Sequence, residues 1–112
     1  MKKILSIVLA LVLLSSVCAF AAAEGEQSIG IAMPTRSLER WNRDGQYLQE
    51  QFEAAGYKVR LTYSDNDDTQ QNNDISNLIA DGVNLLIISA INGETLTQTL
   101  ADAKDAGIPV IA

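Results

Sequence analysis

The chain is poor in the side chains on which most enzyme chemistry depends. Its 112 residues include no histidine and a single cysteine, Cys18. It has no P-loop, and Gly30 stands alone where a dinucleotide-binding segment would carry several glycines. A receiver-type phosphoacceptor would need an aspartate after the apolar segment 84–89, where Ser89 and Ala90 stand instead. We therefore expect a protein that is not an enzyme and that needs no cofactor.

Positive charge is also scarce. The chain has 8 lysines and arginines against 14 aspartates and glutamates, which gives a net charge of −6. Two of the positive residues, Lys2 and Lys3, lie in an N-terminal segment that we expect to be removed. A polypeptide this acidic repels phosphate backbones, so we expect no nucleic-acid partner.

The first 23 residues have the pattern of an export signal. A short positive end at residues 1–3 is followed by an apolar run at residues 4–17, and the alanines at 21–23 offer a cleavage site between small residues. We predict a signal peptide at 1–23 and a mature segment at 24–112. The protein would then be secreted across the cytoplasmic membrane, into the periplasm or cell envelope.

Two other fates of the N-terminal segment stay open. An uncleaved membrane anchor is one, because a membrane span needs about 20 residues and the segment 4–23 has that length. A lipid anchor at Cys18 is the other, although the branched Val17 stands where such sites usually carry a small residue. The alanine-rich end favours cleavage, which would leave a segment without disulfides.

Stretches typical of strands alternate with stretches typical of helices after residue 27, which is the pattern of an α/β fold. The predicted strands are 28–33 (SIGIAM), 58–63 (KVRLTY), 84–89 (NLLIIS) and 109–112 (PVIA). Between them, apolar residues recur at steps of three and four, which indicates amphipathic helices. The stripes are Leu38, Trp41, Gly45, Leu48, Phe52 and Ala55; then Ile75, Leu78 and Ile79; then Leu96, Leu100 and Ala103. Candidate N-caps are Ser37, Asp67 or Asp68, and Asn92 or Gly93.

Each predicted helix ends in a glycine that an apolar residue follows. The three exits are Ala55-Gly56-Tyr57, Asp81-Gly82-Val83 and Ala106-Gly107-Ile108. Glycine can adopt the left-handed conformation that ends a helix, and the next apolar residue packs back as it starts the following strand. The repetition predicts a βα unit that recurs along the chain.

The character of the strands suggests their order in the sheet. Residues 58–63 alternate between polar and apolar side chains, as an edge strand with one wet face does, whereas the other strands are apolar throughout. With right-handed crossovers, we predict a parallel sheet of order 2-1-3-4 flanked by helices, a Rossmann-like arrangement. The winding direction then reverses between the first and third strands.

Ligands of open α/β sheets bind at the carboxyl ends of the strands, where the winding direction reverses. The loops 34–37 and 90–93 lie there, and Arg40 and Trp41 follow the first. An indole offers a flat apolar surface to the C–H face of a sugar, and a guanidinium can donate two hydrogen bonds to neighbouring hydroxyls. By spacing alone, Trp41 could equally belong to the apolar stripe while Arg40 is solvated. Asn92 is a weaker candidate, because it also suits a turn and a cap.

The acidic run at residues 65–68 (DNDD) could suggest calcium. It lacks the glycine and the distal glutamate that a calcium-binding loop requires. A solvated cap for the second helix is the favoured interpretation, and we predict no metal site.

Three segments resemble periplasmic binding proteins of the ribose, xylose and multiple-sugar type: IGIAMPTRSLERWNRDG, NNDISNLIADGVNLLIISAINGETL and DAGIPVIA. The likeness covers residues 28–112. Residues 38–41 (LERW) are most similar to the xylose and multiple-sugar receptors, in which an arginine-tryptophan pair at this place contacts the sugar. The resemblance implies this role for Arg40 and Trp41.

The resemblance also implies a type I periplasmic binding fold, in which two α/β lobes close on a sugar. Residues 24–112 would form part of the N-terminal lobe, and the sequence stops just before an aspartate-arginine pair that binds sugar in relatives. It implies no catalysis but delivery of a monosaccharide, a xylose-like pentose or a hexose, to the membrane permease of an ATP-driven (ABC) importer. We expect a monomer. A sugar-sensing module that engages a membrane sensor or chemoreceptor stays open as an alternative.

Overall fold

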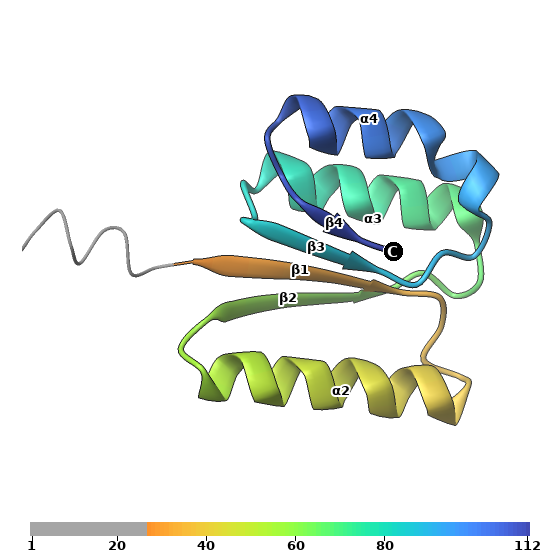
Figure 1. Ribbon diagram of the computed structural model, residues 1–112. Helices are drawn as coiled ribbons and strands as arrows, with labels where there is room; N and C mark the ends of the chain where they lie inside the picture. The colour runs from red at the N-terminus through yellow and green to blue at the C-terminus, as the bar shows by residue number, and fades with distance from the viewer. Residues whose placement is uncertain (1–26) are drawn as a thin grey trace, which may run out of the picture.

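The computed structural model describes residues 27–112, so the predictions of a signal peptide and of the fate of Cys18 lie outside the described residues. Strands and helices alternate along this part of the chain (Figure 1). The strands are β1 (Ser28–Met33), β2 (Lys58–Tyr63), β3 (Leu85–Ile88) and β4 (Val110–Ile111). The helices are α2 (Glu39–Ala54), α3 (Asp68–Ala80) and α4 (Thr97–Asp105), with the 3-10 helix η1 (Gly93–Leu96) before α4. Within residues 27–112, no helix is both long and apolar enough to cross a membrane.

The strands form one parallel sheet in the order β2-β1-β3-β4, which confirms the predicted order. β1 lies between β2 and β3, so that Ile29 is beside both Val59 and Leu85. Ile87 of β3 is beside Ile111 of β4. β3 and β4 are shorter than the predicted runs, although Asn84 and Ser89, the ends of the third run, still donate backbone hydrogen bonds to Ser28 and Ala32 of β1.

β2 is an edge strand, as its alternating sequence predicts. Lys58 and Arg60 are exposed, whereas Val59, Leu61 and Tyr63 are partly buried and pack into the layer under α2. The polar residues of a half-wet strand therefore face water, and the apolar residues face the helix.

The helices cover the sheet on two sides (Figure 1). α2 lies against one face, and α3 and α4 lie against the other. The chain therefore crosses to the opposite face of the sheet after β2, and the winding direction reverses between β1 and β3 as predicted. This reversal is the arrangement that makes a binding crevice at the carboxyl ends of the strands.

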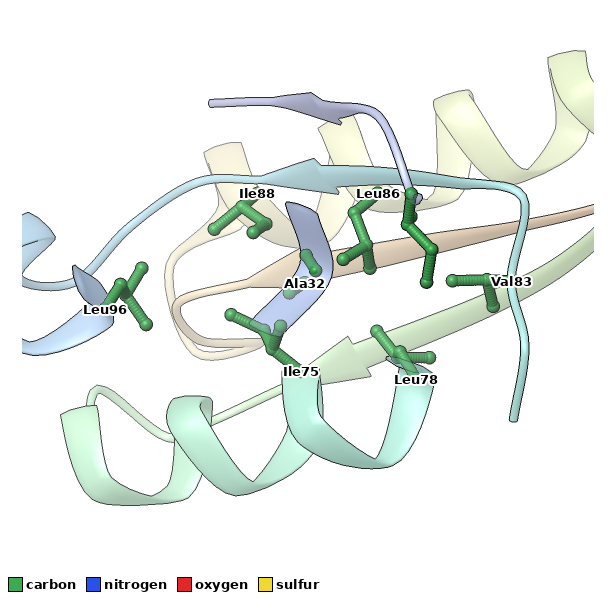
Figure 2. Packing of buried hydrophobic residues seen from close by; sticks show 9 residues of the cluster. Ala32, Ile75, Leu78, Val83, Leu86, Ile88 and Leu96 are labelled. Atoms are coloured by element: carbon green, nitrogen blue, oxygen red, sulfur yellow. The ribbon is translucent and has the colours of Figure 1, made fainter. Parts of the chain in front are cut away.

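The larger part of the core lies between the sheet and α3 (Figure 2). Ile75 and Leu78 of α3 pack against Leu86 and Ile88 of β3 and against Ala32 of β1. Ile75 and Leu86 are fully buried. Each such side chain stabilises the fold by about 1.5–3 kcal/mol relative to its exposed state, so this layer fixes the sheet on which the carboxyl-end loops stand.

The three helix exits have the backbone conformation that the sequence predicts. Gly56, Gly82 and Gly107 have φ angles of 95°, 75° and 74°. The residue after each glycine donates its backbone N–H to a carbonyl oxygen of the preceding helix, as Tyr57 does to Phe52 and Ile108 to Ala103. These bonds satisfy carbonyl groups that a helix end otherwise leaves without partners.

Two details of the helix starts and of the first stripe were predicted wrongly. Ser37 does not cap α2: Leu38 occupies the cap position without a side-chain bond, and the hydroxyl of Ser37 is instead paired with the hydroxyl of Thr35. Leu38 and Ala55, the two ends of the predicted stripe, are exposed, because they lie just outside the helix.

The other two predicted caps are present. Asp67 accepts a hydrogen bond from the backbone N–H of Gln70 at 3.1 Å and so caps α3, as the solvated-cap interpretation of residues 65–68 predicts. Asn92 accepts a bond from the N–H of Glu94 at 3.1 Å, but it caps the 3-10 helix η1 rather than α4 itself.

Candidate functional site

The carboxyl ends of β1 and β3 lie side by side, and the loops that follow them diverge to opposite faces of the sheet. The loop after β1 is held by its own hydrogen bonds: the hydroxyl oxygens of Thr35 and Ser37 are 2.7 Å apart, and Thr35 is buried. After this turn the chain enters α2. The first turn of α2 therefore starts at the reversal point of the sheet, where we expect a ligand.

A groove of about 340 Å³ opens at this place. It is bounded by the ends of β1 and β3 and by the first half of α2. The residues that line it are Met33, Arg40, Trp41, Asp44, Tyr47, Leu48, Ile87 and Ser89. It therefore combines an apolar floor and an aromatic wall with a few convergent polar groups, which is the usual composition of a small-molecule site.

Arg40 and Trp41 stack on one another in this groove. The guanidinium carbon of Arg40 lies 4.5 Å from the centroid of the Trp41 ring. Nε of Arg40 is also 3.8 Å from a carboxylate oxygen of Asp44, but the arginine side chain is 71% exposed. An ion pair that is this exposed contributes little to stability. The guanidinium therefore keeps most of its N–H donors for a ligand.

Trp41 has both of the roles that its position allows. It is partly buried and packs against the cluster of Ile29, Ile31 and Met33, so it belongs to the apolar stripe of α2. It also lines the groove beside Arg40. Because the guanidinium covers one face of the indole, a ligand would meet the two side chains as one surface.

Asn92, the third predicted site residue, does not line this groove. Its side-chain oxygen is used as the cap of η1, and its carbonyl oxygen accepts a bond from Oγ1 of Thr95 at 2.8 Å. Asn92 is exposed, and its Nδ2 donates no hydrogen bond within residues 27–112. It could still donate to a ligand from the loop after β3, but it does not line the groove with Arg40 and Trp41.

Comparison with known proteins agrees with the fold described above. Residues 29–112 match the sequence profile of the periplasmic binding protein domain. The chain belongs to the periplasmic binding protein family. The resemblance of the sequence to periplasmic binding proteins is thereby confirmed.

Sugar-binding proteins are among the similar members of this family. The multiple sugar-binding periplasmic receptor ChvE of Rhizobium radiobacter is 46% identical over 94 residues, which cover 84% of this chain and 26% of the receptor. The D-xylose-binding periplasmic protein of Escherichia coli is 34% identical over 111 residues, covering 99% of this chain and 33% of that protein. A crystal structure of an ABC transporter solute binding protein from Clostridium phytofermentans, with bound β-D-glucose, superposes with a TM-score of 0.75 at 46% identity.

The chain spans only a part of these relatives. The alignment with the Clostridium structure covers 77% of this chain but 26% of that protein. The groove therefore belongs to a segment that corresponds to only part of the length of these periplasmic binding proteins. Any binding by the whole protein is a proposal.

Ser89 and Met33 are groove residues that the sequence did not single out. Ser89 donates its backbone N–H to the carbonyl oxygen of Ala32 at 3.0 Å, and its hydroxyl group makes no hydrogen bond within residues 27–112. The sequence did contain a signal for Ser89, because it is the first polar residue after the apolar run that forms β3. Side chains at the ends of neighbouring parallel strands meet at the same rim.

Two other hollows are present in the described part of the chain. One, of about 520 Å³, lies between α4 and β4 and is lined mainly by apolar residues such as Leu100, Ile108 and Val110. The other, of about 170 Å³, lies at the amino ends of β1 and β3 beside Phe52 and Tyr57. The first is larger than the groove at Trp41, but it follows the open edge of the sheet. We favour the groove because it lies at the reversal point and gathers polar groups.

Proposed function

We propose that the protein to which this chain belongs is the substrate-binding component of an ABC sugar importer. It binds one monosaccharide, a xylose-like pentose or a hexose, between two lobes and delivers it to a permease in the membrane. It performs no reaction on the sugar. Residues 24–112 form part of its N-terminal lobe and supply one wall of the binding cleft.

The stacked pair of Arg40 and Trp41 in the rim groove is the observation that carries this proposal. A monosaccharide has hydroxyl groups in the plane of its ring and C–H groups on its faces. The exposed guanidinium can donate parallel hydrogen bonds to two neighbouring hydroxyls, while the indole and Met33 offer apolar surface to the C–H groups. The free hydroxyl of Ser89 adds a donor and an acceptor across the groove.

The names of the relatives support the same class of ligand. They include a multiple sugar-binding receptor, a D-xylose-binding protein and a solute binding protein with bound β-D-glucose. These relatives share with this chain the segment that contains Arg40 and Trp41. We therefore propose an aldose as the ligand and leave the choice between pentose and hexose to experiment.

The proposal includes the cellular setting. Residues 1–23 act as a signal peptide that directs the protein across the cytoplasmic membrane, and the mature protein begins at Glu24. It works as a monomer in the periplasm or cell envelope, without a lipid anchor at Cys18. Intact-mass measurement of the exported protein tests this part, because cleavage after Ala23 and acylation at Cys18 give different masses.

The binding proposal is tested by calorimetric titration of the full-length protein with D-xylose, D-ribose and D-glucose. We expect saturable binding of at least one of them, with one site per monomer. Absence of binding to all three at millimolar concentrations would refute the proposed ligand class. Binding of a sugar without its uptake by cells that carry the neighbouring transport genes would refute the delivery step alone.

A further inference from the structure

Gln71 is a fully buried polar residue near the start of the buried face of α3. Its relative exposure is 0%. It lies on the same face of the helix as Ile75 and Leu78, at steps of four and three, where an apolar residue is expected. A buried carboxamide is unfavourable unless its donors and its acceptor are paired, so its partners reveal what it does.

Both ends of the carboxamide bind the backbone of the loop after β3. Nε2 of Gln71 donates to the carbonyl oxygen of Ser89 at 3.0 Å. Oε1 accepts from the backbone N–H of Ile91 at 2.9 Å. The two bonds bracket Ala90, so the side chain binds this stretch of loop much as a neighbouring strand would.

The sheet itself stops holding the chain at this point. The N–H of Ser89 makes the last bond to β1, with the carbonyl oxygen of Ala32. Beyond Ser89, the backbone has no strand beside it until η1 begins at Gly93. Gln71 thus replaces the missing neighbour over the few residues that form the rim of the groove.

The next residue of α3 anchors the far end of the same loop. Nδ2 of Asn72 donates to the carbonyl oxygen of Thr95 at 3.0 Å, and Oδ1 of Asn72 accepts from the hydroxyl of Thr99 at 2.5 Å. The loop is therefore fixed at two places, but only Gln71 binds the part that adjoins the groove.

We propose that Gln71 is a positioning residue for the sugar site. It does not line the groove, but it fixes the backbone on both sides of Ala90, so that the side chain of Ser89 is presented to the ligand from one loop conformation. This inference rests on the proposed sugar-binding function. When only a fraction of the molecules has the conformation that binds the ligand, the apparent affinity falls in proportion to that fraction. Release of the loop therefore lowers the affinity although no ligand contact is removed.

The chemistry explains why a glutamine stands here. The loop presents one carbonyl acceptor and one N–H donor, and a neutral carboxamide matches both with its donor and acceptor ends. A methionine has a similar length and no hydrogen bonds of this kind, so Gln71→Met removes both bonds with little change of volume. Gln71→Ala removes them too and leaves room for water to satisfy the loop, which provides a second variant if the first folds poorly.

The test measures amide hydrogen exchange and sugar affinity in the full-length protein. In the wild type, we expect the Ile91 amide to be protected against exchange, because its acceptor is the buried Oε1 of Gln71. In Gln71→Met, we expect its protection to fall at least tenfold and the affinity for the sugar that the wild type binds to fall about tenfold. Thr99→Val is the control, because it removes a hydrogen bond between α3 and α4 without touching residues 89–91; it should lower the urea midpoint and leave affinity within twofold.

The outcomes separate this inference from the proposed function. Unchanged Ile91 protection in Gln71→Met and Gln71→Ala would overturn the anchoring role. Lost protection of the Ile91 amide with unchanged sugar affinity would show that the anchoring of the loop does not affect binding. An equal loss of affinity in Thr99→Val would mean that Gln71 acts only through the general stability of the protein. If the wild type binds no monosaccharide, the proposed function fails and with it the link to sugar, while the exchange of Ile91 still decides whether Gln71 holds the loop.

Discussion

A Cβ atom on Gly45 would lie 2.5 Å from the hydroxyl oxygen of Tyr63 and 3.2 Å from Cδ1 of Leu61. Gly45 is buried in the middle of α2, and the Tyr63 hydroxyl donates a hydrogen bond to the carbonyl oxygen of Asn42 at 3.2 Å. The missing side chain therefore lets α2 lie directly on β2. Because α2 also carries Arg40 and Trp41, this contact sets the distance of the site from the sheet.

Replacement of Gly45 by alanine should destabilise the protein, although alanine favours helix by about 1 kcal/mol. The added methyl group cannot be placed unless Tyr63 or the helix moves, and overpacking of this kind costs about 1–3 kcal/mol. We expect a net loss in the free energy of unfolding in Gly45→Ala, measured by urea denaturation of the full-length protein.

The double variant identifies the cause. Tyr63→Phe removes the hydroxyl oxygen that the new methyl group would meet first, so Gly45→Ala should be less harmful in that background. Equal losses in the two backgrounds would show that the Tyr63 hydroxyl is not the obstacle. A stabilised Gly45→Ala protein would contradict the close packing of α2 on β2.

The same tyrosine makes stability sensitive to alkaline pH. Burial raises the pKa of Tyr63 above its ordinary value, and the positive charge of Arg36, whose guanidinium carbon is 4.8 Å from the ring centroid, partly offsets this rise. The neutral phenol is thus favoured in the folded state. The contribution to stability is complete below the unfolded-state pKa of about 10 and is lost as the pH rises through the folded-state pKa.

We therefore expect the wild type to lose stability faster than Tyr63→Phe between pH 9 and pH 11, in a comparison of urea midpoints. The difference between the ultraviolet titrations of the wild type and of Tyr63→Phe should show that Tyr63 ionises above the ordinary tyrosine pKa of about 10. In Arg36→Gln its pKa should rise further, because the favourable charge is gone. A fall of the Tyr63 pKa in that variant would contradict the assignment.

Gly82 ends α3 with a φ of 75°, and a Cβ added there would touch nothing within 4 Å. The effect of Gly82→Ala is therefore one of backbone strain alone, at about 1–2 kcal/mol for a side chain in the left-handed region. Gly93 offers a matched control, because its added Cβ also meets nothing and its φ lies outside that region. We expect Gly82→Ala to lower the free energy of unfolding and Gly93→Ala to leave it nearly unchanged; equal effects would contradict this account.

Most of the fold could be predicted because several local signals agree. The apolar runs, the stripes and the three glycine exits all describe βα units, and the alternation of Lys58, Arg60 and Thr62 with apolar residues identifies the edge strand. The start of α2 was missed because Ser37 has the right residue type for a cap, but its hydroxyl is paired with the hydroxyl of Thr35. That competition depends on the conformation of the loop, which residue preferences do not describe.

The site was predictable to a lesser extent. The position of Arg40 and Trp41 at the rim follows from the topology, since any first turn after β1 must start there. The stacking of the guanidinium on the indole and the absence of Asn92 from the groove do not follow, because they depend on side-chain rotamers and on the cap of η1. Gln71 gave a signal, a polar residue on the buried face of a helix, but its partners are visible only in three dimensions.

The role of Arg40 can be tested by a variant that should change sugar affinity without changing stability. Its side chain is 71% exposed, so Arg40→Ala should leave the free energy of unfolding nearly unchanged. Hydrogen bonds to a charged group contribute about 1.5–3 kcal/mol, and about 1.4 kcal/mol is a factor of ten in affinity. We therefore expect calorimetry to show a loss of sugar affinity of more than tenfold.

Arg43 provides the matched control for this experiment. It stands on the same helix, is equally exposed at 71%, and lies at the same 3.8 Å from a carboxylate oxygen of Asp44, but it does not line the groove. Arg43→Ala should keep sugar affinity within about twofold of the wild type. Trp41→Leu keeps an apolar side chain against Met33 but removes the indole. We expect it to lower sugar affinity as Arg40→Ala does. Equal effects of Arg40→Ala and Arg43→Ala would mean that only the net charge of α2 matters, and the rim groove would no longer be the place where the sugar binds.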